Sequence, residues 1–331
     1  MEKERKLSHI KLTFDSQTPQ HLADQRFNYE PLFDSTVSAT SLSTGFLGKT
    51  LKAPLWISSM TGGTEIARTI NHNLARACAE FGLGMGLGSC RKLLDSDTHF
   101  EDFNLRPVIG YDLPFFANLG IAQIEELLAK NETGRINSLV DKLHADGLII
   151  HVNPLQEWIQ PEGNIIKESP LKTIERFLEK SAFPVIIKEV GQGFGPESLL
   201  KLLQLPLAAL DFGAYGGTNF SVIELKRRNE EFEKYEPFTR IGHTAFEMLE
   251  TVNRLADTHK NLKCKQLIIS GGIGNYLDGY YLVSRSKIPA IYAQASTFLK
   301  HSQSDYESLQ KFVAGQIEGL RMAKQFLKIR E

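Results

Sequence analysis

Eight short apolar runs recur along the chain, and each is nearly continuous in hydrophobicity instead of alternating with polar residues. They span Pro54–Ser59, Leu83–Ser89, Phe115–Gly120, Gly147–Asn153, Pro184–Gly191, Ala209–Gly213, Gln266–Gly272 and Ala290–Ala295. Continuous apolar character is typical of a strand that is covered on both faces, as in a parallel sheet. Segments of helical periodicity lie between most of the runs, for example Ile66–Phe81, Ile174–Lys180, Thr244–Thr258 and Tyr306–Ile329.

This alternation of strands and helices predicts βα units joined by right-handed crossovers. Eight such units in roughly 250–280 residues match the size of a closed (β/α)8 TIM barrel. A doubly wound open sheet is the alternative architecture. We expect a single domain, in which residues 1–50 form an N-terminal extension that covers the active site and residues 51–331 form the barrel. The charged stretch 224–239 is expected to be a polar insertion after the sixth strand.

Polar residues and glycines follow almost every predicted strand. They are Ser59–Gly63, Gly86–Arg91, Asn118, His151–Asn153, Lys188–Glu189, Gly216–Thr218, Gly271–Gly272 and Ala295–Ser296. In a parallel barrel the carboxyl ends of all the strands lie on one face, where barrel enzymes place their chemistry. The sequence therefore predicts one polar, glycine-rich site at that face.

Composition narrows the class of protein. The 331 residues are 42% hydrophobic and 23% charged, which is enough apolar material for a large core. Thirty-eight Lys and Arg against 39 Asp and Glu argue against nucleic acid as a partner, because binding to a phosphate backbone needs a basic surplus. No apolar run approaches the ~18–20 residues of a membrane span, and no targeting segment is apparent at the start. Three scattered cysteines fit a reducing compartment, so we expect a cytoplasmic protein.

The glycine pairs allow two interpretations. A glycine after a strand is often only a turn residue with positive φ. However, loops after the seventh and eighth barrel strands commonly bind phosphate through backbone N–H groups. Gly271–Gly274 together with Ala295–Ser296 fits such a site, and either flavin mononucleotide (FMN) or a phosphorylated substrate would satisfy it.

A second cluster, His151-x-Asn153-x-x-Gln156-Glu157, follows the fourth strand. It could be an ordinary polar βα loop, but four polar side chains leave one strand end within seven residues on the functional face. Histidine can contact a diphosphate, and the two amides can orient a substrate. One glutamate is enough to hold Mg²⁺ when the substrate phosphates supply further oxygen ligands.

Three further features carry charge or nucleophilic character. Lys188 ends an apolar strand, where it is either paired with Glu189 or another carboxylate, or lies beneath an electron-rich flavin ring. The residues around Arg5 and Lys6 form a basic arm, which is either solvated or the partner of a diphosphate. Cys90, beside Arg91, is either a packing residue or a thiolate favoured by that neighbour.

With these features the chain resembles one family, the type 2, FMN-dependent isopentenyl-diphosphate isomerases. The matching strings occur in the family order and cover nearly the whole chain, and those at 151–157 and 184–191 are quite specific to the family. They are Arg5–Lys6, His9–Ile10, Ser43–Lys49, Ile57–Gly63, Met85–Ser89, Ala117–Gly120, His151–Glu157, Pro161–Gly163, Pro184–Gly191, Gly216–Phe220 and Ser270–Ile273.

The resemblance implies the binding site. The flavin contacts it implies are Ser59, Met60, Thr61, Ser89, Asn118, Lys188 and Thr218, with the FMN phosphate at Gly272, Gly274, Ala295 and Ser296. The substrate contacts it implies are Arg5, Lys6, Ser89, Arg91, His151, Asn153 and Gln156, with Glu157 as the Mg²⁺ ligand. It further implies catalytic roles for Gln156 and Lys188, NADPH as the flavin reductant, and a homo-oligomer that is a tetramer or an octamer.

The implied reaction is a 1,3-allylic proton shift that converts isopentenyl diphosphate to dimethylallyl diphosphate, with reduced FMN as the acid and base. Protonating an unactivated alkene is difficult for side chains with pKa values of ~4 or above, which is consistent with a cofactor doing this work. The alternatives are another FMN-dependent barrel oxidoreductase, or a barrel that binds flavin or a prenyl phosphate without turnover.

Overall fold

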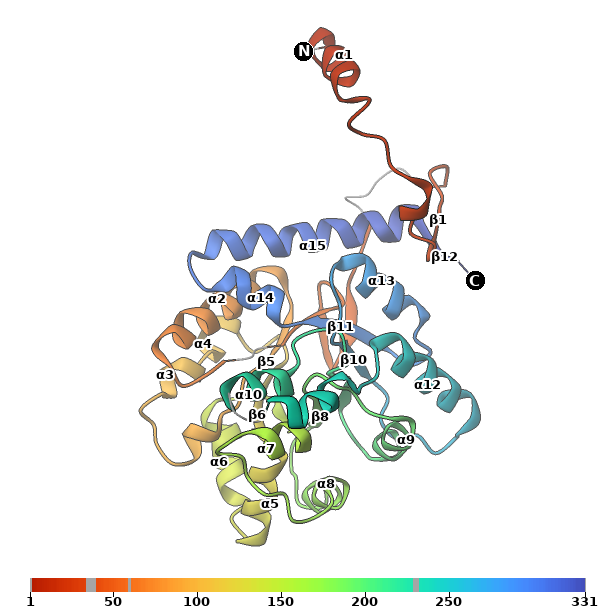
Figure 1. Ribbon diagram of the computed structural model, residues 1–331. Helices are drawn as coiled ribbons and strands as arrows, with labels where there is room; N and C mark the ends of the chain where they lie inside the picture. Colours follow the sequence, from red (N-terminus) through yellow and green to blue (C-terminus); the bar gives the residue numbers. More distant parts are fainter. Residues whose placement is uncertain (1, 34–39, 59–60, 229–231, 331) are drawn as a thin grey trace.

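The structure is a computed structural model that describes residues 2–33, 40–58, 61–228 and 232–330. Within these ranges, eight parallel strands close into a barrel in the order β10-β11-β4-β5-β6-β7-β8-β9 (Figure 1). They are β4 (Leu55–Ser58), β5 (Gly84–Gly86), β6 (Phe115–Gly120), β7 (Gly147–Val152), β8 (Val185–Glu189), β9 (Ala209–Asp211), β10 (Leu267–Ser270) and β11 (Ala290–Gln294). The predicted (β/α)8 barrel is confirmed, and closure of the sheet excludes the open doubly wound alternative.

The helices surround the barrel, and those after each strand return the chain to the next one. They are α2 (Glu65–Phe81), α3 (Phe100–Phe103), α4 (Arg106–Ile109), α5 (Ile121–Ala129), α6 (Gly134–Lys142), α7 (Pro154–Ile159), α8 (Pro170–Leu178), α9 (Pro196–Gln204), α10 (Phe220–Arg228), α11 (Phe232–Tyr235), α12 (Ala245–Thr258), α13 (Tyr276–Arg285), α14 (Ser296–Ser302) and α15 (Tyr306–Phe326), with 3-10 turns η1 (Gln20–Leu22), η3 (Arg91–Leu94) and η4 (Glu236–Arg240). The long α15 lies across α2, α13 and α14 on one side of the barrel (Figure 1). Within the described ranges, no helix is both long and apolar enough to cross a membrane.

One sequence prediction needs correction here, and a second gains structural detail. The last predicted helix, Tyr306–Ile329, ends at Phe326, and β12 (Leu327–Ile329) pairs antiparallel with β1 (Phe27–Tyr29). Helical periodicity could not reveal this, because the partner strand lies at the other end of the sequence. The expected polar insertion at 224–239 is helical over most of its described length, and Glu224 within it is only 5% exposed.

The barrel interior explains why apolar strands end in polar residues. Side chains alternate between the interior and the helical layer along each strand, so residues two apart share a side. Trp56 fills the lower interior: an added Cβ on Gly84 would lie 2.4 Å from its ring, and the Phe116 ring is 6.2 Å away. Two positions above Trp56 and Phe116, at the top of the same strands, Ser58 and Asn118 reach the cavity. Apolar side chains in the lower interior therefore lie beneath the polar side chains that line the cavity.

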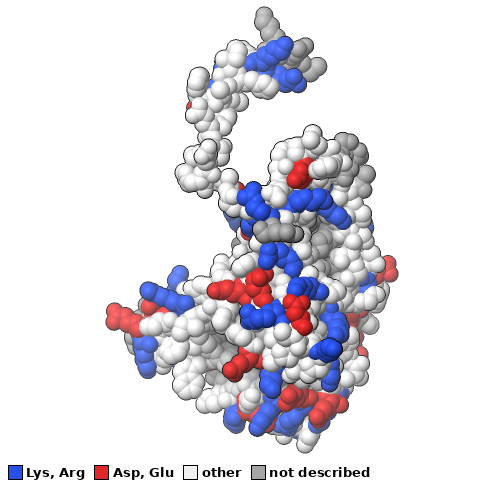
Figure 2. All heavy atoms as spheres, turned by 90° about the vertical axis from the view of Figure 1, so that its right-hand side faces the viewer, with Lys and Arg blue, Asp and Glu red and all other residues white. Residues whose placement is uncertain are grey.

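One part of the N-terminal extension packs against the barrel, and another part projects away from it. A hairpin of β2 (Thr44–Phe46) and β3 (Lys49–Leu51) packs where the barrel strands begin, with Lys49 Nζ 2.7 Å from Asp146 Oδ1 just before β7. The preceding helix α1 (Glu2–Leu12) is exposed throughout its described side chains and projects away from the barrel (Figure 1). Figure 2 shows the extension leaving the body as a hook, with Lys and Arg side chains near its far end.

Candidate active site

A cavity of about 500 Å³ opens at the carboxyl ends of the barrel strands. Most of the site residues expected from the sequence line it, although they come from every part of the barrel. They are Ser89, Arg91, Asn118, His151, Asn153, Gln156, Glu157, Lys188, Thr218, Gly272, Gly274, Ala295 and Ser296. The predicted convergence of the strand ends on one site is therefore present in the structure.

Five expected residues lie elsewhere or cannot be placed. Arg5 and Lys6 are exposed on α1 and do not contribute to the cavity lining. Thr61 is also outside the lining, although its backbone packs behind it: an added Cβ on Gly88 would lie 2.6 Å from Thr61 O. Ser59 and Met60 lie outside the described residues.

His151 is held as a neutral imidazole. Asn118 Nδ2 donates to Leu87 O at 2.9 Å, so Asn118 Oδ1 accepts from His151 Nδ1 at 2.7 Å. This network assigns the proton to Nδ1 and leaves Nε2 as an acceptor. Burial, and then the nearby charge of Lys188, lower the pKa of His151 to about 4. The ring is therefore held uncharged at neutral pH.

Helix α7 presents an amide and carboxylate cluster to the cavity. The three- and four-residue spacings bring Asn153, Gln156 and Glu157 together: Asn153 Nδ2 donates to Gln156 Oε1 at 3.0 Å and to Glu157 Oε1 at 3.2 Å. Glu157 Oε2 also accepts from the backbone N–H of Asn164 at 2.7 Å. Asn153 Oδ1 is buried, and no described residue forms a hydrogen bond with it. Buried amide and carboxylate oxygens side by side are the donor chemistry that Mg²⁺ prefers.

A second carboxylate stands behind this cluster. Gln156 Nε2 donates to Glu224 Oε1 at 3.3 Å, and Arg227 Nη1 lies 2.5 Å from Glu224 Oε2. The sequence analysis missed Glu224 because it falls in a run of charged residues that looks like a solvated surface. Its position in the turn after Phe220, with the buried Leu225 beside it, is the signal that could have placed it inward.

Lys188 is paired within the barrel. Strand register sets it beside His151 of β7 and Asp211 of β9. Its Nζ lies 3.0 Å from Asp211 Oδ2 and 3.3 Å from Ser270 Oγ, while the Ser270 hydroxyl donates to Asp211 Oδ1. The expected partner was Glu189 or another carboxylate, and the structure selects Asp211. An acidic residue inside the apolar run Ala209–Gly213 is the signal that could have identified this carboxylate.

Glu189 instead fixes the loop after β8. Its Oε2 accepts from the backbone N–H groups of Gly191, Gln192 and Gly193 at 2.7, 2.6 and 2.8 Å. Burial raises the pKa of Glu189, and the three hydrogen bonds oppose that rise. This carboxylate shapes a loop that lines the cavity.

The glycine loops after β9 and β10 pack against each other. An added Cβ on Gly271 would lie 2.0 Å from Ala214 O, and one on Gly217 would lie 3.1 Å from Gly272 N. Gly271 and Gly272 have φ values of 87° and 69°, which favour glycine. These positions are therefore turns with positive φ and also sites of close backbone approach, and phosphate binding there stays a prediction.

Besides Asn153 Oδ1, two buried polar atoms in the lining have no hydrogen-bond partner among the described residues. They are Ser58 Oγ and Gln294 Oε1, and the Gln294 amide also donates through Nε2 to Ile273 O at 3.1 Å. A buried polar atom without a hydrogen bond costs free energy, so such atoms facing a cavity indicate a polar ligand.

Cys90 is a packing residue. Its side chain is fully buried, and burial raises the pKa of the thiol to about 12. The alternative that Arg91 favours a thiolate is therefore wrong, because desolvation outweighs the neighbouring charge.

The described parts of the chain contain no group of three or more His, Cys, Asp or Glu side chains placed to hold a metal ion. A metal at Glu157 would therefore have a single carboxylate ligand and take its remaining oxygens from amides, water or a bound phosphate. The unpartnered Asn153 Oδ1 fits this requirement.

The fold and the cavity together define a (β/α)8-barrel enzyme that works at the carboxyl ends of its strands. Among known proteins, the chain is 36% identical over 282 residues to an isopentenyl-diphosphate delta-isomerase of Rickettsia typhi, covering 83% of this chain and 80% of the relative. It is 33% identical to that of Rickettsia africae, covering 96% of this chain and 92% of the relative. Identity to the Chlorobium phaeobacteroides enzyme is also 33%, covering 83% of this chain and 78% of that protein. The chain belongs to the isopentenyl-diphosphate delta-isomerase family.

Solved structures with a similar fold include an enzyme that binds FMN. A mandelate oxidase variant with an FMN adduct is similar at a TM-score of 0.56, with 11% identity over 92% of this chain and 89% of the other. A flavocytochrome b2 variant is similar at 0.61, with 16% identity over 91% of this chain and 72% of the other. At these identities the likeness concerns the barrel fold alone. No family model matches the sequence.

Proposed function

We propose that the protein interconverts isopentenyl diphosphate and dimethylallyl diphosphate by a 1,3-allylic proton shift that depends on FMN and Mg²⁺. The observation that carries this proposal is the α7 cluster of Asn153, Gln156 and Glu157, which faces a glycine-lined cavity in a chain of this family. Metal-binding oxygens and a phosphate-accommodating loop in one cavity suit a diphosphate substrate and a nucleotide cofactor.

The cavity residues fit FMN. Its phosphate would lie at Gly272, Gly274, Ala295 and Ser296, in the same cavity as Gln294 Oε1, which has no hydrogen-bond partner among the described residues. Its ring would contact Ser89, Asn118, Lys188 and Thr218, with Ser59, Met60 and Thr61 as further proposed contacts. In reduced form FMN would supply the acid and base for the proton shift, and NADPH is the proposed reductant.

The α7 side of the cavity would bind the diphosphate. Glu157 would hold Mg²⁺, and Asn153 would orient the phosphate oxygens. Arg91 would contribute positive charge, and His151 and Ser89 would contribute hydrogen bonds. Gln156, fixed between Asn153 and Glu224, would hold the carbon chain against the flavin.

Charge in the cavity supports a role for the basic arm. Among its described lining residues, Arg91 and Lys188 are balanced by Glu157 and Glu189, while His151 is neutral. A diphosphate together with an FMN phosphate would need additional cations. We propose that Arg5 and Lys6 supply them by movement of α1 over the cavity, as expected for an extension that covers the active site.

An anaerobic assay with reduced FMN, Mg²⁺ and isopentenyl diphosphate tests the proposal. Glu157→Gln should abolish Mg²⁺-dependent isomerisation while FMN still binds, because the amide cannot replace the anionic ligand. Glu162→Gln, at an exposed site ion-paired with Arg227, is the matched control and should remain active. Full activity of Glu157→Gln would show that Glu157 is not the Mg²⁺ ligand.

A parallel assay with oxidised FMN distinguishes the alternatives. Net oxidation of an organic substrate, with its two electrons reducing the FMN, would identify an FMN-dependent oxidoreductase. Flavin binding without turnover of any prenyl diphosphate would identify a binding barrel. The tetrameric or octameric state and the cytoplasmic location stay predictions.

A further inference from the structure

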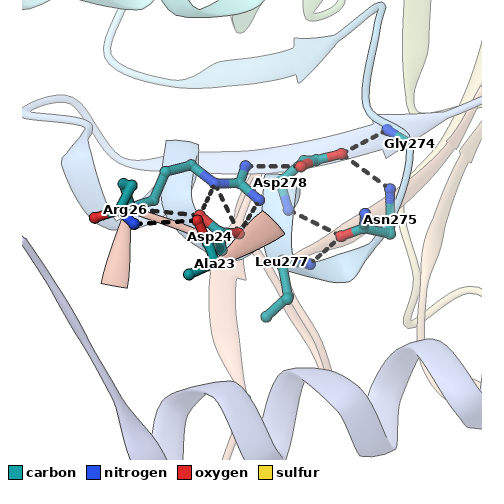
Figure 3. Close-up of polar contacts among 8 residues, drawn as sticks. Ala23, Asp24, Arg26, Gly274, Asn275, Leu277 and Asp278 are labelled. Atoms are coloured by element: carbon teal, nitrogen blue, oxygen red, sulfur yellow. Dashed lines mark hydrogen bonds and ion pairs between the residues drawn. The ribbon is translucent and has the colours of Figure 1, made fainter. Parts of the chain in front are cut away.

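The loop proposed to bind the cofactor phosphate is held at its far end by an aspartate. Asp278 Oδ2 accepts from the backbone N–H groups of Gly274 at 2.8 Å and Asn275 at 3.1 Å (Figure 3). Asn275 caps α13, and its bond with Asp278 completes an ordinary capping box. The hydrogen bond from Gly274 is not part of the capping box. It connects the Asp278 carboxylate to a residue that lines the cavity.

This arrangement has an electrostatic cost. A phosphate at the loop would be an anion close to the carboxylate of Asp278, and like charges in a partly buried site repel each other. Gln294, only 4% exposed, lines the same cavity with an unpartnered Oε1 and binds Ile273 O of the loop, which independently indicates a polar ligand there. The loop therefore needs a positive charge next to Asp278.

The N-terminal extension provides that charge. Arg26 Nη1 donates to Asp278 Oδ1 at 2.7 Å, so the guanidinium and the loop share one carboxylate (Figure 3). Asp24 holds the other side of the guanidinium, with Nη2 2.6 Å from Asp24 Oδ2. Arg26 also lies over the rings of Phe27 and Tyr281, 5.3 and 5.4 Å from their centroids. The guanidinium is fixed on four sides and offsets part of the charge of Asp278 at a constant geometry, while Asp24 shares the same cation.

We propose that Arg26 is a positioning residue for the phosphate-binding loop: it neutralises Asp278, which in turn holds Gly274, so that the loop can accept an anionic phosphate. The inference rests on the proposed function, because the phosphate in question is the phosphate of FMN. It assigns a role in cofactor binding to a part of the extension that does not itself line the cavity.

The test compares FMN with riboflavin, which carries the same ring without the phosphate. Each flavin is titrated by fluorescence into the flavin-free full-length protein. Arg26→Gln should weaken FMN binding about tenfold, a loss of about 1.4 kcal/mol, and change riboflavin binding less than about twofold. Arg26→Lys should retain most of the FMN preference, because it keeps the charge. The Arg26→Gln/Asp278→Asn double variant should return to within about threefold of wild type, because both charges are then removed.

Arg330→Gln is the matched control. Arg330 also ties the extension to the body, through Nη1 to Gln25 Oε1 at 2.6 Å and Nε to Asn28 Oδ1 at 3.1 Å, but it does not contact Asp278. It should leave the preference for FMN unchanged. Equal loss of both flavins in Arg26→Gln, an unchanged FMN affinity, or the same loss in Arg330→Gln would overturn the inference.

Three further outcomes are informative. If Arg26→Gln does not fold, Asp278→Asn decides, because its amide oxygen can still accept from the Gly274 N–H while the negative charge is gone. It should bind FMN at least as tightly as wild type, and weaker binding of FMN alone would overturn the inference. If the wild-type protein binds neither flavin, the proposed function fails together with the inference. Binding of FMN by the wild type and by Arg26→Gln alike would overturn the inference alone.

Discussion

Lys188 Nζ lies 3.0 Å from Asp211 Oδ2, joining two neighbouring barrel strands at the floor of the cavity. The Asp211 side chain is fully buried, whereas that of Lys188 is 18% exposed. The lysine is therefore held toward the cavity by a carboxylate that has no access to water. Its charge is fixed in position, as stabilisation of an electron-rich ring would require.

Replacing Lys188 should destabilise the flavin-free protein. Lys188→Met leaves Asp211 as a buried charge without its cation, and we expect a loss of about 3 kcal/mol in the free energy of unfolding. Urea denaturation of the flavin-free protein measures this loss. The Lys188→Met/Asp211→Asn variant should recover part of it, because the buried charge is then gone. A double variant no more stable than the single one would show that the pair is not electrostatically coupled.

The low pKa of His151 predicts a pH-dependent stability. The folded protein holds the ring neutral down to a pKa of about 4, whereas an unfolded histidine titrates at ~6.5. The unfolded state therefore binds more protons between these values, and stability falls as pH decreases through this window. In His151→Gln this contribution is absent, so its loss of stability from pH 7 to pH 4.5 should be smaller by about 2–3 kcal/mol.

Urea denaturation of wild type and His151→Gln at matched pH values checks this prediction. The difference between the two proteins removes the contributions of the carboxylates that both contain. Parallel pH profiles would mean that the ring is not held neutral in the folded state.

Glu224 should act through Gln156. Glu224→Leu removes the acceptor of the Gln156 amide, and we expect kcat to fall about 10- to 100-fold with little change in KM for the diphosphate. Glu224→Gln keeps an acceptor oxygen while removing the charge, so it separates the hydrogen bond from the electrostatic effect. Steady-state kinetics with reduced FMN measure both parameters. A rise in KM with unchanged kcat in Glu224→Leu would contradict a positioning role.

The close approach at Gly271 predicts a strong effect of a single methyl group. Gly271→Ala would place a Cβ 2.0 Å from Ala214 O at a φ of 87°, and we expect it to cost about 2–3 kcal/mol of stability and to weaken FMN binding. Gly315→Ala is the opposite control: it lies within α15 with no atom within 4 Å of the added Cβ. It should stabilise the protein by about 0.5–1 kcal/mol, as measured by thermal unfolding.

Much of the fold could be predicted because the strand signal is local. The run at Phe115–Gly120 coincides with β6, and the other seven predicted strands contain the observed ones, which are shorter by one to four residues. Most of the extra residues follow the carboxyl ends of the strands, where Gly88, Asn153 and Gly213 are examples that line the cavity, so much of the overestimate falls on the site. The strand formed by residues 327–329 was missed because its partner at residues 27–29 is remote in sequence.

The site residues likewise divide into those that the local sequence indicates and those that depend on partners remote in sequence. Residues next to a strand end, such as Asn118 and His151, could be placed because the barrel fixes where strand ends lie. Glu224 and Asp278 could not, because their importance arises from hydrogen bonds to Gln156 and Gly274 that depend on tertiary packing. Nothing in the local sequence around Arg26 indicates that its partner is 252 residues away.

The pairing of β1 with β12 also bears on the order of events during synthesis. Phe27–Tyr29 leave the ribosome long before the strand that anchors them, Leu327–Ile329. Arg26 can meet Asp278 only after nearly the whole barrel has emerged. While the barrel strands are being made, β1 therefore has no partner strand to pair with, and the contact between Arg26 and Asp278 forms late.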